Sequence, residues 1–224
     1  MTLAKANNKK PATLSVFGSK PQGAIMTPQM PLNARNNCQS GRWTIGDSEY
    51  GSKLSMSILK YSLFYGSLGQ TSHCPWGQIW FVAESGDLPL GVTMCTYIKS
   101  RSLTDFHRLL NEIQAKGIEP ANGVFVPEFK KQSGSVPDGK GGTQAVNYYS
   151  LSWSWEERTD EHNSIENLAA VIDDPNQLGN MIDIESTKRM DCLDGLNQAQ
   201  KQAIIDKVLA EYEANNSTAL TTTN

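Results

Sequence analysis

Carboxylates in the C-terminal third are the first groups in this chain that could do chemistry. Asp173, Asp174, Asp183 and Glu185 lie within a short stretch, and Lys188 follows closely. Clustered carboxylates can hold a divalent metal ion and activate water for hydrolysis. The stretch is, however, among the least hydrophobic parts of the chain, and its spacing matches no familiar hydrolytic motif. We therefore interpret it as a solvated acidic linker.

A glycine-rich segment offers a second candidate. Residues 134–140 (GSVPDGK) match the first seven positions of the phosphate-binding pattern GxxxxGK. The eighth position is Gly141, where a Ser or Thr is needed to hold magnesium. A strand-like run follows, whereas a phosphate-binding loop is followed directly by a helix. These departures exclude a phosphate-loop NTPase. Lys140, which lies between glycines, is instead typical of a flexible basic loop that closes over a nucleic-acid backbone.

Cysteine and histidine patterns indicate no metal site and no nucleophile. The four cysteines form no CxxC or CxxH pair, and no GxSxG or HExxH motif is present. His73 and Cys74 are adjacent, but neighbouring side chains on an extended chain point to opposite faces. We therefore predict a protein that is not an enzyme, with no cofactor and no bound metal.

The charge changes sign along the chain. Residues 1–150 carry 15 Lys and Arg against 9 acids, a net charge of +6, whereas residues 151–224 carry 5 against 14, a net charge of −9. The formal total of −3 therefore hides a basic part followed by an acidic part. A basic region whose sequence also predicts β-sheet is typical of polyanion-binding proteins.

Aromatic residues are interleaved with basic ones throughout the basic part. Exposed bases stack on aromatic faces for roughly 1 to 3 kcal/mol each, while Lys and Arg neutralise phosphates. This pattern favours contacts to a single nucleic-acid strand, and we expect about half of the aromatics to be buried instead. The predicted nucleic-acid-binding residues are Arg42, Trp43, Lys53, Lys60, Tyr61, Tyr65, Trp76, Trp80, Lys99, Arg101, Lys130, Lys131 and Lys140.

These residues must be positioned by strands. Alternating apolar residues predict a long strand from Leu54 to Tyr65, with a bulge near Leu59 and Lys60 where the alternation slips. Residues 76–85 and 88–100 are joined by a short turn and predict an antiparallel hairpin. Two further strands are predicted at 123–131 and 145–158, around a long loop at 130–143. In the second of them, alternation places Tyr149, Leu151, Trp153 and Trp155 on one face, which we interpret as core.

Two helices are predicted. The first covers residues 102–117, where Ser102 and Asp105 resemble a capping box and an apolar stripe would pack on the sheet. The second runs from Asn197, a capping residue, to Ala214 and has one apolar side. This second helix would dock either on its own domain or on a partner chain, and the sequence does not choose between them.

The composition divides the chain into four parts. Residues 1–40 predict a flexible arm, 41–157 a β-rich domain, 158–195 an acidic linker, and 196–224 a C-terminal helix and tail. No apolar run is long enough to span a bilayer, and the N-terminus lacks a signal-peptide hydrophobic region. We therefore expect no membrane partner and a cytoplasmic location.

The order of elements resembles the oligonucleotide-binding (OB) barrel of single-stranded-DNA-binding proteins. Strands, one capping helix, two strands around a long loop and an acidic region follow one another over roughly residues 41–157 and beyond. The resemblance implies a mainly β protein with α, namely a small antiparallel barrel with one capping helix, plus a C-terminal helix. No signature motif accompanies it, so no individual residue takes its role from that family.

The sequence thus predicts non-enzymatic binding of single-stranded DNA, by aromatic stacking and phosphate contacts. One alternative is an assembly protein that forms oligomers through its arm and its terminal helix. A less favoured alternative is a metal-dependent nuclease that uses Asp173, Asp174, Asp183 or Glu185. Sequence preference and the choice between DNA and RNA stay open.

Overall fold

The computed structural model describes residues 25–26, 32–137, 142–173 and 189–221 of the 224-residue chain. These residues are mainly β, with three α-helices. The strands are β1 (Leu32–Asn37), β2 (Arg42–Ile45), β3 (Ser48–Glu49), β4 (Leu54–Leu68), β5 (Thr71–Gly86), β6 (Thr93–Lys99), β7 (Gly123–Pro137), β8 (Thr143–Glu157) and β9 (Met190–Cys192). The helices are α1 (Ser100–Ala115), α2 (Ile165–Asp173) and α5 (Gln198–Thr221), with a short 3-10 turn at Pro120–Asn122.

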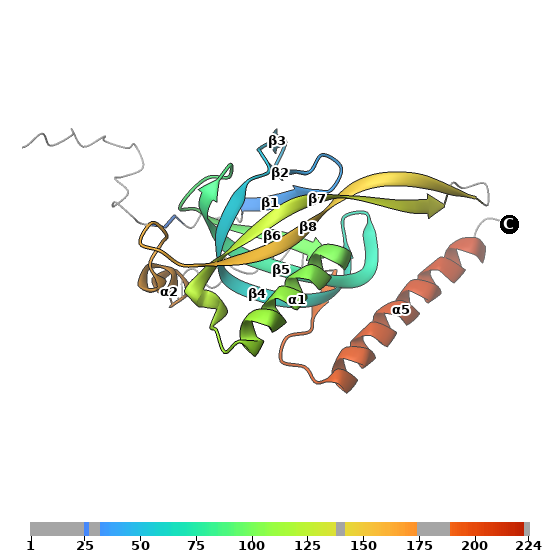
Figure 1. Cartoon of the computed structure of the whole chain (residues 1–224). Coiled ribbons are helices and arrows are strands. Elements are labelled where there is room, and N and C mark those ends of the chain that lie inside the picture. The colour runs from blue at the N-terminus through green and yellow to red at the C-terminus, as the bar shows by residue number, and fades with distance from the viewer. Residues whose placement is uncertain (1–24, 27–31, 138–141, 174–188, 222–224) are drawn as a thin grey trace, which may run out of the picture.

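The nine strands described form one sheet in the order β3-β2-β1-β6-β5-β4-β7-β8, with β9 beside β4 (Figure 1). All neighbours are antiparallel except β1 and β6, which are parallel. The barrel closure that we expected does not occur through strand pairing among the described residues. The free edge of β6 is occupied by β1, so β8 cannot pair with β6 and the sheet stays open.

The predicted long strand is confirmed as β4, and so is its bulge. The register between β4 and β5 shifts between Ile58 and Lys60, so that Lys60 faces Trp80 across the pair. Leu59 is the extra residue, and it packs against the outer face of the sheet. The slip in alternation therefore predicted a real change in side-chain direction.

The hairpin predicted over residues 76–100 is confirmed as β5 and β6, but the predicted loop at 130–143 is wrong over most of its length. β7 and β8 stay paired from Gly123 opposite Glu157 to Pro137 opposite Thr143. Ser, Gly and Lys suggested a loop, yet backbone pairing holds them extended, since strand pairing depends little on side-chain type at solvent-exposed positions. The tip of this hairpin, residues 138–141, lies outside the described residues and includes Lys140.

The predicted arm contributes to the sheet. Residues 32–37 lie in the range that we expected to be flexible, but they form β1, which pairs with β2 and with β6. Ala34 is fully buried there, and Asn36 donates hydrogen bonds to the Thr96 hydroxyl (3.2 Å) and to the Tyr97 carbonyl (2.7 Å). In LNARNN only Leu32 and Ala34 alternate with polar residues, which is too short a pattern to predict a strand. The polar contacts of Asn36 involve a strand about 60 residues away, so local spacing does not reveal them.

Helix α1 packs across the sheet as predicted, although its N-terminus differs from the expected capping box. The N-cap is Lys99, without a side-chain hydrogen bond, and Ser102 is a buried residue inside the helix. The Ser102 hydroxyl instead accepts the backbone N–H of Leu151 at 2.9 Å. Ser102 therefore joins the helix to β8 rather than ending the helix.

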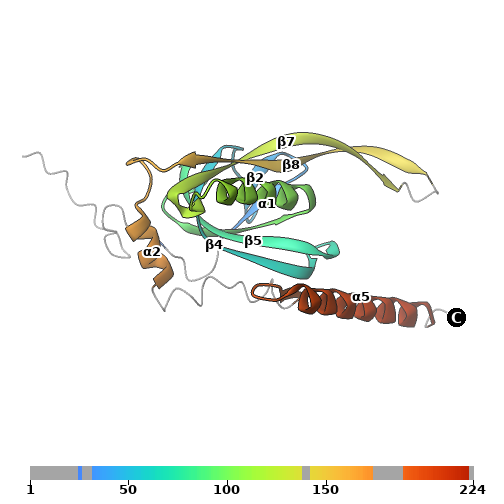
Figure 2. The ribbon, with the colours of Figure 1, turned by 60° about the horizontal axis from the view of Figure 1, so that its bottom comes forward.

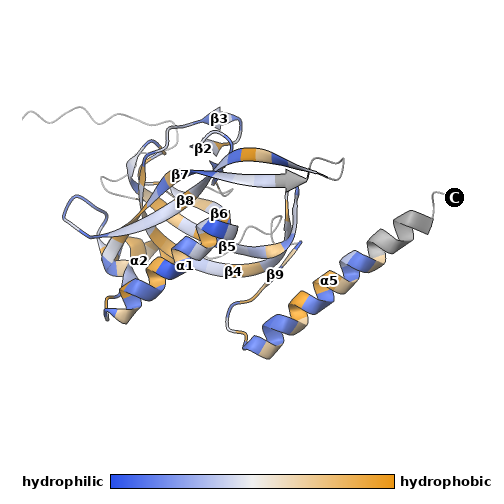
Figure 3. Ribbon diagram, turned by 45° about the vertical axis from the view of Figure 1, so that its right-hand side comes forward, coloured by the Kyte–Doolittle hydropathy of each residue, from blue (hydrophilic) through white to orange (hydrophobic). Residues whose placement is uncertain are grey.

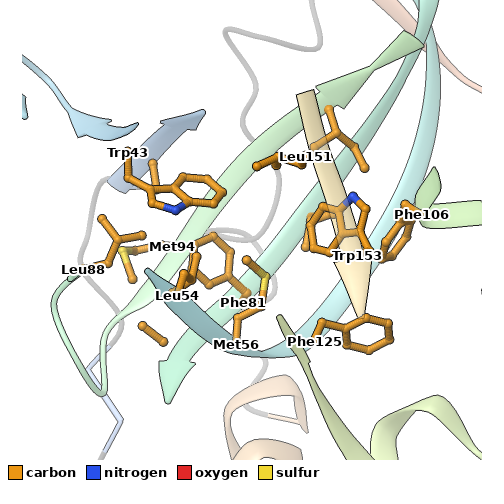
Figure 4. Close-up of a cluster of buried hydrophobic side chains, with 14 of the residues drawn as sticks. Trp43, Leu54, Met56, Phe81, Leu88, Met94, Phe106, Phe125, Leu151 and Trp153 are labelled. Atoms are coloured by element: carbon orange, nitrogen blue, oxygen red, sulfur yellow. The ribbon is translucent and has the colours of Figure 1, made fainter. Parts of the chain in front are cut away.

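The core lies between the inner face of the sheet and α1 (Figure 4). Its largest members come from strands far apart in the sequence, and Phe106 of α1 packs edge-on against Trp153 with ring centroids 5.0 Å apart. Figure 4 shows Trp43, Phe81 and Met94 on one side of this core and Trp153, Phe106 and Phe125 on the other. The predicted core face of the last strand is confirmed for Leu151 and Trp153.

The segment predicted as an irregular acidic linker contains two regular elements. Leu168 and Val171 of α2 pack on Trp80 and Val82 of the outer sheet face. Strand β9 adds to β4, where Met190 packs against Phe64 and Trp76. Apolar residues of α2 and β9, which lie within this acidic segment, therefore cover part of the outer face of β4 and β5.

The predicted terminal helix is confirmed as α5, and Asn197 caps it. The Asn197 side chain accepts the Gln200 N–H at 3.0 Å, and the Gln200 side chain accepts the Asn197 N–H at 2.9 Å. Figures 1 and 2 show α5 at the opposite end of the molecule from α2, and its Tyr212 ring lies 4.2 Å from the His73 ring of β5, measured between centroids. No helix in the described part of the chain is long and apolar enough to cross a membrane.

Candidate nucleic-acid interface

Lys99 lies at the end of β6, where the chain turns into α1. Its ammonium nitrogen is 5.1 Å from the centroid of the Trp76 ring and donates a hydrogen bond to the Thr71 hydroxyl. Trp76 is directly opposite Lys99 in the β5–β6 register and is itself 6% exposed. A ring with so little exposed surface cannot stack on a base, so Trp76 serves to hold the Lys99 cation in place.

The turn between β1 and β2 lies close to the same cation. Burial raises the pKa of the Cys38 thiol, and the positive charge of Lys99 partly offsets this rise. The pKa of Cys74 on β5 is raised by burial and lowered by Lys99 in the same way. The field of Lys99 therefore reaches both the β1–β2 turn and the β5 strand.

Strand β8 meets this turn from the other side. The Tyr149 N–H donates to the Cys38 carbonyl at 2.7 Å, which is a direct backbone link between β8 and the turn. The Tyr149 ring lies over Gly41, where a Cβ would come within 3.0 Å of it and where φ is +70°. Glycine is therefore required at this close approach. Lys131 of β7 is directly opposite Tyr149 and shares its face.

The N-terminus of α1 completes the arrangement. Ser102 accepts the Leu151 N–H, and its carbonyl accepts the Trp153 indole N–H at 3.1 Å. Arg101, the residue before Ser102, is exposed. These bonds fix Arg101 beside the part of β8 that carries Tyr149, because Tyr149 is only two residues before Leu151.

We call this region the hairpin junction, consisting of Cys38, Trp76, Lys99, Arg101, Lys131 and Tyr149. Its residues come from β5, β6, β7, β8, the β1–β2 turn and the start of α1. The β4–β5 and β7–β8 hairpins project from the same end of the molecule (Figures 1 and 2). No carboxylate of the described residues forms an ion pair with Lys99, Arg101 or Lys131. Three cations from three elements are therefore left to attract an anion.

Several predicted contact residues lie elsewhere because the fold buries them. Trp43 is fully buried and packs edge-on against Phe129, with ring centroids 5.4 Å apart. Trp80 is 1% exposed beneath α2, and its indole N–H has no hydrogen-bond partner among the described residues. Tyr65 is also buried. In this conformation none of these rings presents a face on which a base could stack.

Tyr61 is half-buried and turns toward α1 rather than outward. Its ring packs on Phe106, and its hydroxyl is hydrogen-bonded to Nε2 of His107. Burial raises the pKa of the Tyr61 hydroxyl, and the negative charge of Asp194 adds to this rise. Tyr61 therefore belongs to the packing between the sheet and the helix.

The remaining predicted cations are separate from the junction or already paired. Arg42 forms an exposed ion pair with Glu49 at 3.1 Å, and Lys130 forms one with Glu128 at 2.6 Å. Lys60 lies on the outer face of β4 opposite Trp80. Burial raises the pKa of the Cys192 thiol on β9, and the positive charge of Lys60 partly offsets this rise. Lys53 is exposed at the start of β4, where its backbone N–H donates to Asp87 at 2.7 Å.

Sequence reasoning missed four members or neighbours of the junction. Tyr149 was assigned to the core, whereas it is only partly buried, with its ring over the β1–β2 turn, and Tyr148 beside it is also only partly buried. Nothing in the local sequence around Thr71 or Cys38 predicts a place in this site, because their contacts are made with residues far away in the chain. Tyr148 and Tyr149 stand next to each other in an acid-free stretch, which was a usable clue.

For the alternative nuclease, Asp173 is exposed at the end of α2, and Asp174, Asp183 and Glu185 lie outside the described residues. Within the described ranges, no group of three or more His, Cys, Asp or Glu side chains is placed to hold a metal ion. Comparison with known proteins found no matching family model, no matching curated protein and no matching solved structure.

Proposed function

We propose that this protein binds single-stranded DNA at the hairpin junction without catalysing a reaction. The observation that carries the proposal is that Lys99, Arg101 and Lys131 belong to elements that backbone and side-chain bonds of Tyr149 and Ser102 join, while no described carboxylate forms an ion pair with them. Phosphate contacts supply much of the affinity in protein–nucleic-acid complexes. Unpaired cations on three connected elements are therefore suited to contacts with successive phosphates of a backbone.

The strand order supports this proposal. Strands β6, β5, β4, β7 and β8 are consecutive neighbours, and α1 connects β6 to β7. We propose that these five strands and the helix form an OB-like module, to which β1, β2 and β3 are added at the β6 edge. OB folds bind oligonucleotides on the face of their second and third strands and with the loops that join strands one to two and four to five. The corresponding parts here are β5, β6 and the two long hairpins.

The β7–β8 hairpin supports it further. Residues 129–137 and 142–155 contain no Asp or Glu, and Lys130, Lys131 and hydroxyl-bearing residues are exposed along the arm. A two-stranded hairpin that projects into solvent is only marginally stable alone. A polar, basic arm of this kind is expected to be held by an anionic partner, since it carries little apolar surface for a protein contact.

Because Trp43 and Trp80 are buried, base stacking should contribute less to the binding free energy than phosphate contacts do. Stacking would fall to partly buried side chains such as Tyr148 and Tyr149, rather than to Trp43 or Trp80. Each stacked base contributes roughly 1 to 3 kcal/mol, so two tyrosines would add less than a full aromatic platform. We therefore expect affinity to depend mainly on phosphate contacts and to fall steeply with salt.

The test is a titration of fluorescein-labelled oligo-dT with the full chain, followed by anisotropy at low and moderate salt, with a duplex of the same length beside it. Tight, salt-sensitive binding of the single strand and much weaker binding of the duplex are expected. Absence of binding to either nucleic acid at low salt would overturn the proposal. Equal affinity for both would replace it with nonspecific polyanion binding.

A further inference from the structure

Helix α5 carries an apolar stripe that the rest of the described structure covers only in part. The stripe consists of Ile204, Ile205, Val208, Leu209 and Tyr212, which follow helical spacing. Leu209 is 38% exposed and Tyr212 is 46% exposed, and no described α5 side chain is buried. Figure 3 shows hydrophobic residues on this helix where it stands clear of the sheet. Five large apolar residues on one free helix face are typical of an interaction surface.

The segment that leads into the helix is hydrogen-bonded to β4. The Leu193 N–H donates to the Leu63 carbonyl at 2.7 Å, and the Leu63 N–H donates to the Asp194 carboxylate at 2.8 Å. Further along, the Tyr212 ring lies 4.2 Å from the His73 ring, measured between centroids. The root of α5 is therefore held in place while its apolar stripe stays accessible.

A helix in this situation needs a partner surface. The 24 residues of α5 span about 36 Å. Most helical stability in proteins comes from packing of an apolar face, and propensity alone leaves an isolated helix marginal. The sequence of its second half, with Asn, Ser and Thr, is not that of a strong helix former. The stripe must therefore gain its stabilisation from another molecule.

The charges on α5 indicate which molecule that is. The first half carries Lys201, Asp206 and Lys207, a net charge of +1, and the second half carries Glu211 and Glu213, a net charge of −2. Within one helix, Lys207 also lies 3.9 Å from Glu211. When two copies lie antiparallel and cross at Val208, each lysine falls within about one turn of a glutamate of the other copy. A parallel pair would instead place lysines beside lysines. Self-complementary charge of this kind is the requirement for a two-fold symmetric contact.

We propose that α5 is a self-association helix that pairs antiparallel with α5 of a second copy of this chain. The stripe would be buried at the two-fold axis around Val208, with the charged residues at its edges. The pairing does not depend on the hairpin junction. It would, however, place two junctions in one particle and so allow two sites to engage one strand.

The first test measures the mass of the full chain by sedimentation equilibrium in the absence of nucleic acid. The expected result is a dimer at micromolar concentration, which becomes monomeric when Val208→Lys places a charge in the stripe. Ala210→Lys is the matched control, since Ala210 lies on the opposite face of the same helix, and it should stay dimeric. A wild-type chain that is monomeric at all concentrations, or a Val208→Lys variant that stays dimeric, would overturn the proposal.

A charge exchange tests the partner. Lys201→Glu with Lys207→Glu gives an acidic helix, and Glu211→Lys with Glu213→Lys gives a basic one. Each double variant alone should dissociate at least tenfold more readily than the wild type, and an equimolar mixture should recover the dimer. A mixture no tighter than either variant alone would exclude pairing of α5 with α5. Near-UV circular dichroism identical to the wild type shows that the sheet is intact in each variant.

Discussion

Glu84 and Arg158 form an ion pair with 3.4 Å between Oε1 and Nη1, although their side chains are only 2% and 11% exposed. Ser57 is hydrogen-bonded to both, and Asn163 donates its backbone and side-chain N–H groups to Glu84 at 2.9 and 2.8 Å. Arg158 also donates to the Gly123 carbonyl at 3.1 Å. The pair thus joins the ends of β5 and β8 to the turn that leads into α2.

Substitution of Arg158 is expected to destabilise the fold strongly. Arg158→Met leaves Glu84 buried without its cation, and breaking a buried pair from one side costs about 3 to 5 kcal/mol. The measurement is the free energy of unfolding in urea. Arg42→Met is the control, because the Arg42–Glu49 pair is exposed and its loss should change stability by less than about 1 kcal/mol. Equal losses in the two variants would contradict this account of the buried pair.

The attachment of β9 to β4 is expected to depend on Gly66. A Cβ at Gly66 would lie 2.3 Å from the Arg189 carbonyl oxygen, whereas at Gly69 it would meet nothing within 4 Å. Both glycines have positive φ, so alanine strains the backbone at either position. Only Gly66→Ala should also displace β9. Trypsin cleavage after Arg189, followed by mass spectrometry, should become at least about tenfold faster in Gly66→Ala than in Gly69→Ala, since about 1.4 kcal/mol of easier opening gives that factor.

Stability should decrease in mild acid because of His107. Burial lowers the pKa of His107, and the neutral imidazole can accept the hydrogen bond of the Tyr61 hydroxyl. The unfolded chain therefore takes up this proton more readily than the folded one. The contribution is absent above the unfolded pKa of about 6.5 and becomes destabilising as the pH falls below it. The unfolding free energy measured from about pH 7.5 to 5 should fall less steeply in His107→Gln than in the wild type; identical slopes would contradict this assignment.

Local patterns in the sequence predicted the elements that depend on local spacing. The alternation around Leu59 identified β4 and its bulge, and Asn197 marked the start of α5. Both signals lie within a few residues of the feature that they predict. Side-chain period and capping chemistry are sufficient at this range.

Elements made by distant partners could not be predicted in the same way. β1 depends on the free edge of β6, and β9 has three residues that become a strand only beside β4. The same limit applies to the candidate site. Nothing near Trp80 in the sequence shows that α2 covers it. We therefore predicted Trp80 as a nucleic-acid contact, because it is an aromatic residue in a basic region, whereas the structure buries it. Lys99 kept an accessible position because β6 ends there.

Removal of junction cations should reduce the salt dependence of DNA binding in steps. For a single strand, each phosphate that the protein no longer neutralises lowers the slope of log K against log salt by about 0.7. Lys131→Ala and Lys99→Ala should each lower it by about this amount, and the double variant by about twice as much. Lys131 is exposed at the surface, so its substitution should leave stability within about 0.5 kcal/mol of the wild type.

Arg108→Ala is the matched control for this series, because it removes the same charge from the exposed surface of α1, where Arg108 pairs with Asp105 at 3.3 Å. If binding were a response to net charge alone, Arg108→Ala would weaken it as much as Lys131→Ala does. If the strand lies across the hairpin junction, Arg108→Ala should leave the slope unchanged. Anisotropy with labelled oligo-dT at four or more salt concentrations separates these outcomes, since the slope measures the number of ions released whatever the absolute affinity.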